Sequence, residues 1–226
     1  MPALALYGLL LTASVDELAA QLRSGTWDQR TVAAAMLATH GEQARPAVPA
    51  LAAALQDPRA TSLFRTTATT TLGVLGPAAR EAVPALLAIV SNADPERAAE
   101  DELWDQARAN AAYALGRAGS DDRGRVVPAL LAAVPEARGN LRDLALGALE
   151  TLGLRAEDEA AALPALTRVL QEWKLSTEGQ RAAAVLLGRM GPRARSALPA
   201  LEAALMSRDD GVRQAAVEAL RKIQGR

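Results

Sequence analysis

The sequence predicts an all-α fold, a solenoid of about six antiparallel helix pairs. One observation is a short phrase, such as Ala47-Val-Pro-Ala-Leu51, that recurs five times with prolines at positions 49, 84, 128, 164 and 199. A second is a Leu followed four residues later by Gly in the first five units, from Leu37/Gly41 to Leu187/Gly191. The steps of 35, 44, 36 and 35 residues between the prolines are typical of repeat arrays, in which each unit is one supersecondary element.

Composition limits the core and the chemistry of the chain. Half of the 226 residues are hydrophobic but only 3% are aromatic, so Ala, Leu and Val must fill the interior. The net charge of −1 gives no global attraction to nucleic acid or to an anionic membrane. The absence of cysteine excludes disulfides and thiolate metal sites and leaves the redox compartment open, and the single histidine, His40, excludes a multi-histidine cluster. We therefore expect no metal and no cofactor.

The N-terminal residues 1–13 carry no charged side chain, and Asp16 is the first charged residue. The stretch is shorter than the roughly 18 to 20 residues of a membrane span, so no span is expected. We interpret it as a helix that caps the first repeat; the alternatives are a degenerate signal peptide, which lacks the basic start, and a partner-binding helix. The expected location is cytoplasmic, or exported if residues 1–13 are a signal remnant.

The first helix of each predicted pair follows the recurring phrase, and its apolar residues stand three or four apart, as in Val48, Leu51 and Leu55. The first helical stretch begins at Ser14, where Glu17 completes a capping-box pattern. The repeated proline fits either the first turn of a helix, where its missing N–H is harmless, or a kink inside a longer one. The sequence leaves both alternatives open.

The second helix of each pair carries an arginine seven positions before its Leu in five of six copies. These residues form an arginine ladder: Arg30, Arg65, Arg108, Arg142 and Arg213, with Gln180 as the exception. The Gly that follows fits a helix C-terminus, where a left-handed residue satisfies loose carbonyls. The ladder has two interpretations, a structural lock between adjacent repeats or a track for carboxylates or phosphates, and the planar guanidinium suits the lock.

We predict that residues 14–226 form one array with an acidic insertion around residues 91–105, where the step lengthens to 44 residues. This stretch has six acidic side chains against Arg97 alone, a local net charge of −5, and it contains Trp104. Residues 180–226 have nine Lys or Arg and four acids, a net of +5. The near-zero total charge is therefore the sum of two regions of opposite sign. Added loops such as the insertion often have a functional role.

These features together resemble HEAT repeats, most closely the short bacterial HEAT-like repeats of phycobilisome-lyase type. The resemblance rests on the proline in the first helix, the arginine that opens the second, and segments 76–86 and 112–119. It implies a right-handed superhelix with the first helices on the convex side and the second helices lining the concave side. It also implies a scaffold that holds a protein or peptide, since only a minority of the family are lyases, hydroxylases or DNA glycosylases.

Candidate contact residues follow if the second helices line the concave face. Positions six and two before each Leu should then face a partner: Thr31, Thr66, Thr70, Tyr113, Asp143, Arg181 and Glu218 are the candidates. Tyr113 is the only large ring among them, and such amphipathic rings are typical anchors. Trp104, in the acidic insertion, is a further candidate, although its place before a ladder arginine, shared with Trp27, favours packing under the turn.

The function expected from these patterns is a non-catalytic scaffold for a partner protein or peptide. An enzyme is not expected, because the chain lacks a paired acid and base, a nucleophile elbow, a phosphate loop and a metal-ligand cluster. One alternative is nucleic-acid binding through the basic C-terminal third, disfavoured by the acidic middle and the few rings for base stacking. The other is an accessory protein similar to a bilin lyase. The charged side chains of the last helix suggest a monomer.

Overall fold

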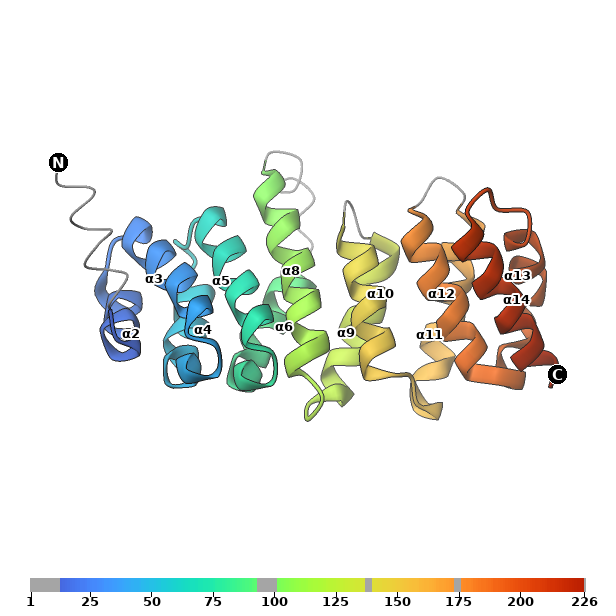
Figure 1. The fold of residues 1–226 in the computed structure, drawn as a ribbon, viewed down its shortest axis with the longest axis horizontal. Coiled ribbons are helices and arrows are strands. Elements are labelled where there is room, and N and C mark those ends of the chain that lie inside the picture. The colour runs from blue at the N-terminus through green and yellow to red at the C-terminus, as the bar shows by residue number, and fades with distance from the viewer. Residues whose placement is uncertain (1–12, 93–100, 137–139, 173–175, 226) are drawn as a thin grey trace. The chain divides into compact units, whose positions relative to one another are not determined.

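The fold is helical throughout the residues that the computed structural model describes, 13–92, 101–136, 140–172 and 176–225. No strand occurs in these residues, so the all-α prediction is confirmed. The chain divides into two compact units, Met1–Asp121 (unit 1) and Asp122–Arg226 (unit 2). Figure 1 shows the helices of both units.

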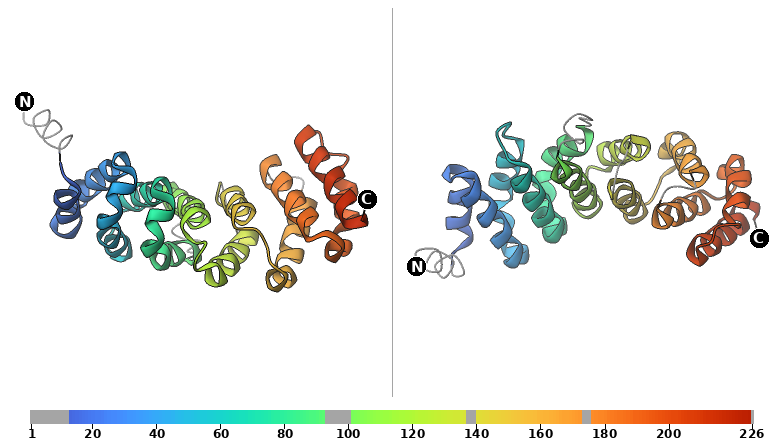
Figure 2. Two further views of the ribbon diagram at one scale, coloured as in Figure 1. Left: turned by 60° about the horizontal axis from the view of Figure 1, so that its bottom comes forward. Right: turned by 90° about the horizontal axis from the view of Figure 1, so that it is seen from above.

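Unit 1 consists of three helix pairs in its described residues. Its first helices are α2 (Val15–Ser24), α4 (Val48–Gln56) and α6 (Val83–Ser91), and its second helices are α3 (Trp27–Thr39), α5 (Ser62–Leu75) and α8 (Glu102–Ala118). The second helices pack side by side, α3 on α5 and α5 on α8, while α2 packs on α4 and α4 on α6. The two kinds of helix therefore form two layers within the unit (Figure 2).

Unit 2 repeats this arrangement with three further pairs in its described residues. The first helices are α9 (Arg123–Glu136), α11 (Glu159–Gln171) and α13 (Leu198–Ala204), and the second helices are α10 (Leu141–Leu152), α12 (Thr177–Met190) and α14 (Asp210–Gln224). Here α10 packs on α12 and α12 on α14, with α9 on α11 and α11 on α13 in the other layer. The pairs match the predicted solenoid, and the right hand of its superhelix stays a prediction.

Small aliphatic side chains form the core, as composition predicts. The repeated Leu of the second helices is fully buried in the first five copies: Leu37, Leu72, Leu115, Leu149 and Leu187. Alanine and glycine let neighbouring second helices approach closely, because a Cβ atom added to Gly188 of α12 would lie 2.9 Å from the Cα atom of Ala219 in α14. A larger residue at position 188 would push these two helices apart.

The repeated prolines occur in both of the settings that the sequence leaves open. Pro49, Pro84 and Pro199 lie in the first turns of α4, α6 and α13, each after a short 3₁₀ helix: η1 (Gly41–Ala47), η2 (Gly76–Ala82) and η4 (Gly191–Ala197). Pro128 and Pro164 instead lie inside the longer helices α9 and α11. Four of the five predicted closing glycines have positive φ, as does Gly225 after the last helix, while Gly119 has φ −93° and closes α8 without it.

The predicted start of the array at Ser14 is a capping box. Ser14 Oγ accepts a hydrogen bond from the backbone N–H of Glu17 (3.3 Å), and the carboxylate of Glu17 accepts one from the N–H of Ser14 (2.7 Å). These hydrogen bonds lower the pKa of Glu17. Residues 1–12, and most of the acidic insertion at residues 93–100, lie outside the described residues, so the predictions made for them stay predictions.

One described stretch, Ser62–Ser91, is long and apolar enough to cross a membrane. It runs through α5, η2 and α6, and 61% of its most apolar window is buried inside the protein. The core helix of a repeat array passes the same test of length and composition, so the stretch alone does not indicate a span. The expected absence of a membrane span stays a prediction.

Candidate functional site

The arginines of the ladder bind the ends of the first helices. Each guanidinium donates to a backbone carbonyl at or just after the C-terminus of the first helix in its own pair. The acceptors are Gly25 and Arg23 for Arg30, Leu55, Asp57 and Ala60 for Arg65, Val90 for Arg108, Val134 for Arg142, and Ser207 for Arg213, at 2.7–3.4 Å. Gln180, the exception in the sequence, takes the same role, because its Nε2 donates to the carbonyl of Glu172 (3.3 Å).

This geometry places the ladder inside each helix pair rather than between adjacent repeats. A cation at a helix C-terminus satisfies carbonyls that have no intrahelical partner and interacts favourably with the helix dipole. Arg65 and Arg108 are only 7% and 4% exposed, and burial lowers the pKa of the Arg108 guanidinium. A partner cannot reach these two arginines, so they do not form part of a surface track.

Trp104 packs at the start of a second helix, as its position favours, and its candidate role as a contact residue on an inserted loop is corrected. The residue belongs to α8, which begins at Glu102, and its side chain is fully buried. The guanidinium of Arg65 lies 5.4 Å from the centre of its ring, so the contact joins α5 to α8. In the preceding pair, Arg30 lies 4.6 Å from the ring of Trp27. Both tryptophans pack beside a ladder arginine, and Trp104 is not available to a partner.

In unit 1, exposed apolar side chains gather on two neighbouring second helices. Leu63 and Val74 of α5 are 53% and 50% exposed, and Leu103 and Tyr113 of α8 are each 42% exposed. We call this surface the α5/α8 face; its members are Leu63, Thr66, Thr67, Thr70 and Val74 of α5 and Leu103, Asn110, Tyr113 and Arg117 of α8. It includes three of the predicted contact residues, Thr66, Thr70 and Tyr113.

Hydrogen bonds across the seam between α5 and α8 hold this face together. Thr66 Oγ1 donates to the carbonyl oxygen of Leu103 (2.9 Å), and Asn110 Nδ2 donates to Thr70 Oγ1 (2.8 Å). Tyr113 lies against Gly73, where an added Cβ would be 2.9 Å from the ring. The two helices are therefore joined along their seam by these hydrogen bonds and by the packing of Tyr113 on Gly73.

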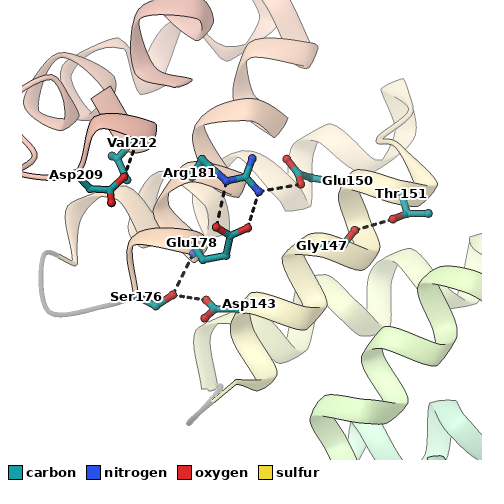
Figure 3. Close-up of polar contacts among 10 residues, drawn as sticks. Asp143, Gly147, Glu150, Thr151, Ser176, Glu178, Arg181, Asp209 and Val212 are labelled. Carbon is teal, nitrogen blue, oxygen red and sulfur yellow. Dashed lines mark hydrogen bonds and ion pairs between the residues drawn. The ribbon is translucent and has the colours of Figure 1, made fainter. Parts of the chain in front are cut away.

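Asp143 and Arg181 both lie at the seam between α10 and α12 in unit 2, each with its own partners (Figure 3). Ser176, the N-cap of α12, donates its hydroxyl to Asp143 Oδ1 (2.5 Å). Arg181 donates to both carboxylate oxygens of Glu178 (2.6 and 3.2 Å) and forms an ion pair with Glu150 of α10 (3.8 Å). The bond from Arg181 holds the pKa of Glu178 below its ordinary value and raises that of Arg181. These contacts satisfy the charge of Arg181 within the chain.

The two remaining candidates, Thr31 and Glu218, lie on other helices. Thr31 of α3 is half-buried, and its hydroxyl donates to the carbonyl of Trp27 one turn earlier (2.7 Å). Glu218 is exposed on α14. The described residues contain no group of three or more side chains that could hold a metal ion.

Six members of the α5/α8 face were not predicted: Leu63, Thr67, Val74, Leu103, Asn110 and Arg117. One signal was present in the sequence for α5, because Ser62–Leu75 contains a single charged residue, Arg65, in a protein of 23% charged residues. A helix with exposed positions but no exposed charge is unusual for a solvated surface. Contact positions chosen at fixed offsets from the repeated Leu do not include these six.

Comparisons by sequence find no relative: no protein-family model matches the chain, and no curated protein does. Solved structures do match. A crystal structure of an engineered protein from the Northeast Structural Genomics Consortium superposes with a TM-score of 0.70 at 19% identity, covering 95% of this chain and 98% of that one. Computationally designed armadillo-repeat proteins for modular peptide recognition give 0.71 at 18% identity, with 92% and 99% covered.

The chain is a helical-repeat solenoid. At these identities the likeness shows the fold alone, and it agrees with the two-layered units described above. Human deoxyhypusine hydroxylase in complex with glycerol gives a TM-score of 0.37, which is too low to support an inference about this chain.

Proposed function

We propose that this solenoid is a non-catalytic scaffold that binds a segment of another protein on the α5/α8 face. The observation that carries the proposal is the exposure of Leu63, Val74, Leu103 and Tyr113 on two adjacent helices. Contiguous exposed apolar surface marks interaction sites, and large rings such as Tyr113 are typical anchors.

Two further points support the proposal. The designed armadillo-repeat proteins share the fold and are described as made for modular peptide recognition. The resemblance of the sequence to bacterial HEAT repeats also favours a scaffold, although this assignment rests on the repeat phrases alone. A cytoplasmic location and a monomeric state belong to the same proposal.

Site-specific photo-crosslinking in the source cells tests this function. The photoreactive residue p-benzoylphenylalanine is placed in the full chain at position 63, 74 or 113. Matched controls carry it at position 53 or 88, two exposed alanines on the first helices α4 and α6. We expect one shared adduct from the three test positions and not from the controls. The same adducts from both sets, or none from either, would contradict the proposal.

Nucleic-acid binding by the basic C-terminal third is the alternative that the local positive charge supports. Several of these arginines are engaged within the chain: Arg181 pairs with Glu178 and Glu150, Arg193 with Glu159, and Arg213 with Asp210. Partial neutralisation weakens the attraction for phosphates. An accessory role similar to a bilin lyase would instead appear as visible absorbance of a pigment that purifies with the protein.

A further inference from the structure

We infer that the α5/α8 face selects a partner segment whose contacting side chains are uncharged and aliphatic, with a carboxylate at one end that binds Arg117. This inference rests on the proposed function and deepens it by naming the chemistry of the partner. Three features of the face support it: the absence of exposed charge on α5, the threonine hydroxyl protons that are already donated within the chain, and the oriented guanidinium of Arg117 at one end.

The first feature is the neutral surface of α5. The only charged residue of Ser62–Leu75 is Arg65, which is buried and donates to three carbonyls. A charged side chain of a partner that packed on α5 between Leu63 and Val74 would lose water and find no exposed opposite charge on this helix. Burying an unpaired ion is strongly unfavourable, so this part of the face discriminates against charged segments.

The second feature is that the threonine hydroxyls of the face already donate within the chain. Each hydroxyl has one proton. Thr66 gives it to the carbonyl of Leu103 (2.9 Å), Thr67 to that of Leu63 (2.9 Å) and Thr70 to that of Thr66 (2.8 Å). The threonines therefore offer a partner methyl groups and acceptor lone pairs, but no free donor. A row of threonines that suggests a polar site in the sequence is thus suited to aliphatic contacts.

The third feature is Arg117, which is fixed at one end of the face. Its Nη1 donates to the hydroxyl oxygen of Tyr113 (2.9 Å), and its guanidinium lies 3.1 Å from the place of a Cβ atom on Gly76. Arg117 remains exposed, and among the described residues no carboxylate forms an ion pair with it. A guanidinium held in this way is prepared to bind a carboxylate of the partner through two parallel hydrogen bonds.

The length of the face sets the length of the segment. Leu63 and Val74 are eleven residues apart on one helix, which corresponds to about 16 Å. A helical segment of about eleven residues, or an extended one of about five, spans this distance. A library of twelve-residue peptides therefore covers both conformations.

The test is selection of random twelve-residue peptides displayed on phage against the immobilised full chain. Wild type is compared with Val74→Asp, Arg117→Glu and the control Ala53→Asp, an exposed position on α4; each is first checked for helical circular dichroism. We expect wild type to enrich peptides with four or more consecutive uncharged, mostly aliphatic residues and an acidic residue at one end. Val74→Asp and Arg117→Glu should each weaken these peptides by about 10-fold or more, and Ala53→Asp by less than about 2-fold.

The outcomes separate this inference from the proposed function. Enriched peptides with charged centres, or aliphatic peptides that bind Arg117→Glu as tightly as wild type, would overturn the inference and leave peptide binding intact. Enrichment no greater than on an unrelated helical protein would overturn both. The strongest support would be that Arg117→Glu enriches peptides with a basic residue at the end in place of an acidic one. In this variant only the sign of the charge at one end of the face has changed.

Discussion

Gly147 is a glycine that neither the backbone nor the packing requires. It lies in the interior of α10, has no positive φ, and a Cβ atom added to it would meet no atom within 4 Å (Figure 3). Alanine is favoured over glycine in a helix interior because it loses less backbone freedom on folding. We expect Gly147→Ala to stabilise the protein by about 0.5–1 kcal/mol, seen as a higher urea midpoint with an unchanged m-value.

Gly188→Ala is the matched control for this prediction, since Gly188 also lies in a second helix of unit 2. Its added Cβ would approach the Cα atom of Ala219 to 2.9 Å, so α12 and α14 would have to separate. We expect destabilisation by about 1–3 kcal/mol, as in other overpacked cores. Equal effects of the two substitutions would show that the close approach of α12 and α14 does not decide whether the added methyl group stabilises or destabilises the protein.

Residues that act on their own helix could be predicted from the sequence, whereas residues that act across a seam could not. The capping box at Ser14 depends on four consecutive residues, and the closing Leu and Gly of the first five repeats lie within five. The bond from Asn110 to Thr70 instead joins residues 40 positions apart on two helices. It depends on the rotation of α8 against α5, which a single sequence does not specify.

At the scale of one helix pair, the ladder arginine supplements the C-terminal cap of the first helix. Arg65 donates to three carbonyls at or after the end of α4, those of Leu55, Asp57 and Ala60, and so ties α4 to α5. The sequence predicted that the position matters, because it recurs in five of six copies. The sequence did not show which helix the guanidinium binds. The interpretation as a lock placed the contact between adjacent repeats, whereas the guanidinium binds the first helix of its own pair.

We expect Arg65→Leu to destabilise the protein by about 3 kcal/mol, because three buried carbonyls would lose charged donors while the leucine fills only part of the space. Thermal unfolding followed by circular dichroism measures this effect. The control is Arg59→Ala in the same turn, whose side chain is 81% exposed and pairs with Asp57. That change should lower the unfolding temperature far less than Arg65→Leu, because exposed ion pairs contribute little to stability. Similar losses from both would mean that the buried carbonyls are satisfied in another way.

At the scale of the whole chain, the distribution of charge separates the two main functional hypotheses. The net charge of −1 conceals a helix α5 without exposed charge in unit 1 and a net charge of +5 over residues 180–226 in unit 2. A partner on the α5/α8 face meets one exposed cation, Arg117, whereas a nucleic acid on unit 2 would have to neutralise several phosphates with arginines that are partly engaged by Glu178, Glu150 and Glu159.

Salt dependence therefore distinguishes these hypotheses in one measurement. For the peptides selected on the α5/α8 face, we expect the dissociation constant to change by less than about 3-fold between 50 and 200 mM NaCl, because only one ion pair is screened. Binding through six to ten phosphate contacts would lose about 10³–10⁵ in affinity over the same range. Fluorescence anisotropy with a selected peptide and with a 30-base-pair duplex provides both curves. Submicromolar binding of the duplex at 200 mM NaCl, abolished by Arg195→Glu, would replace the protein-binding scaffold by a nucleic-acid-binding one.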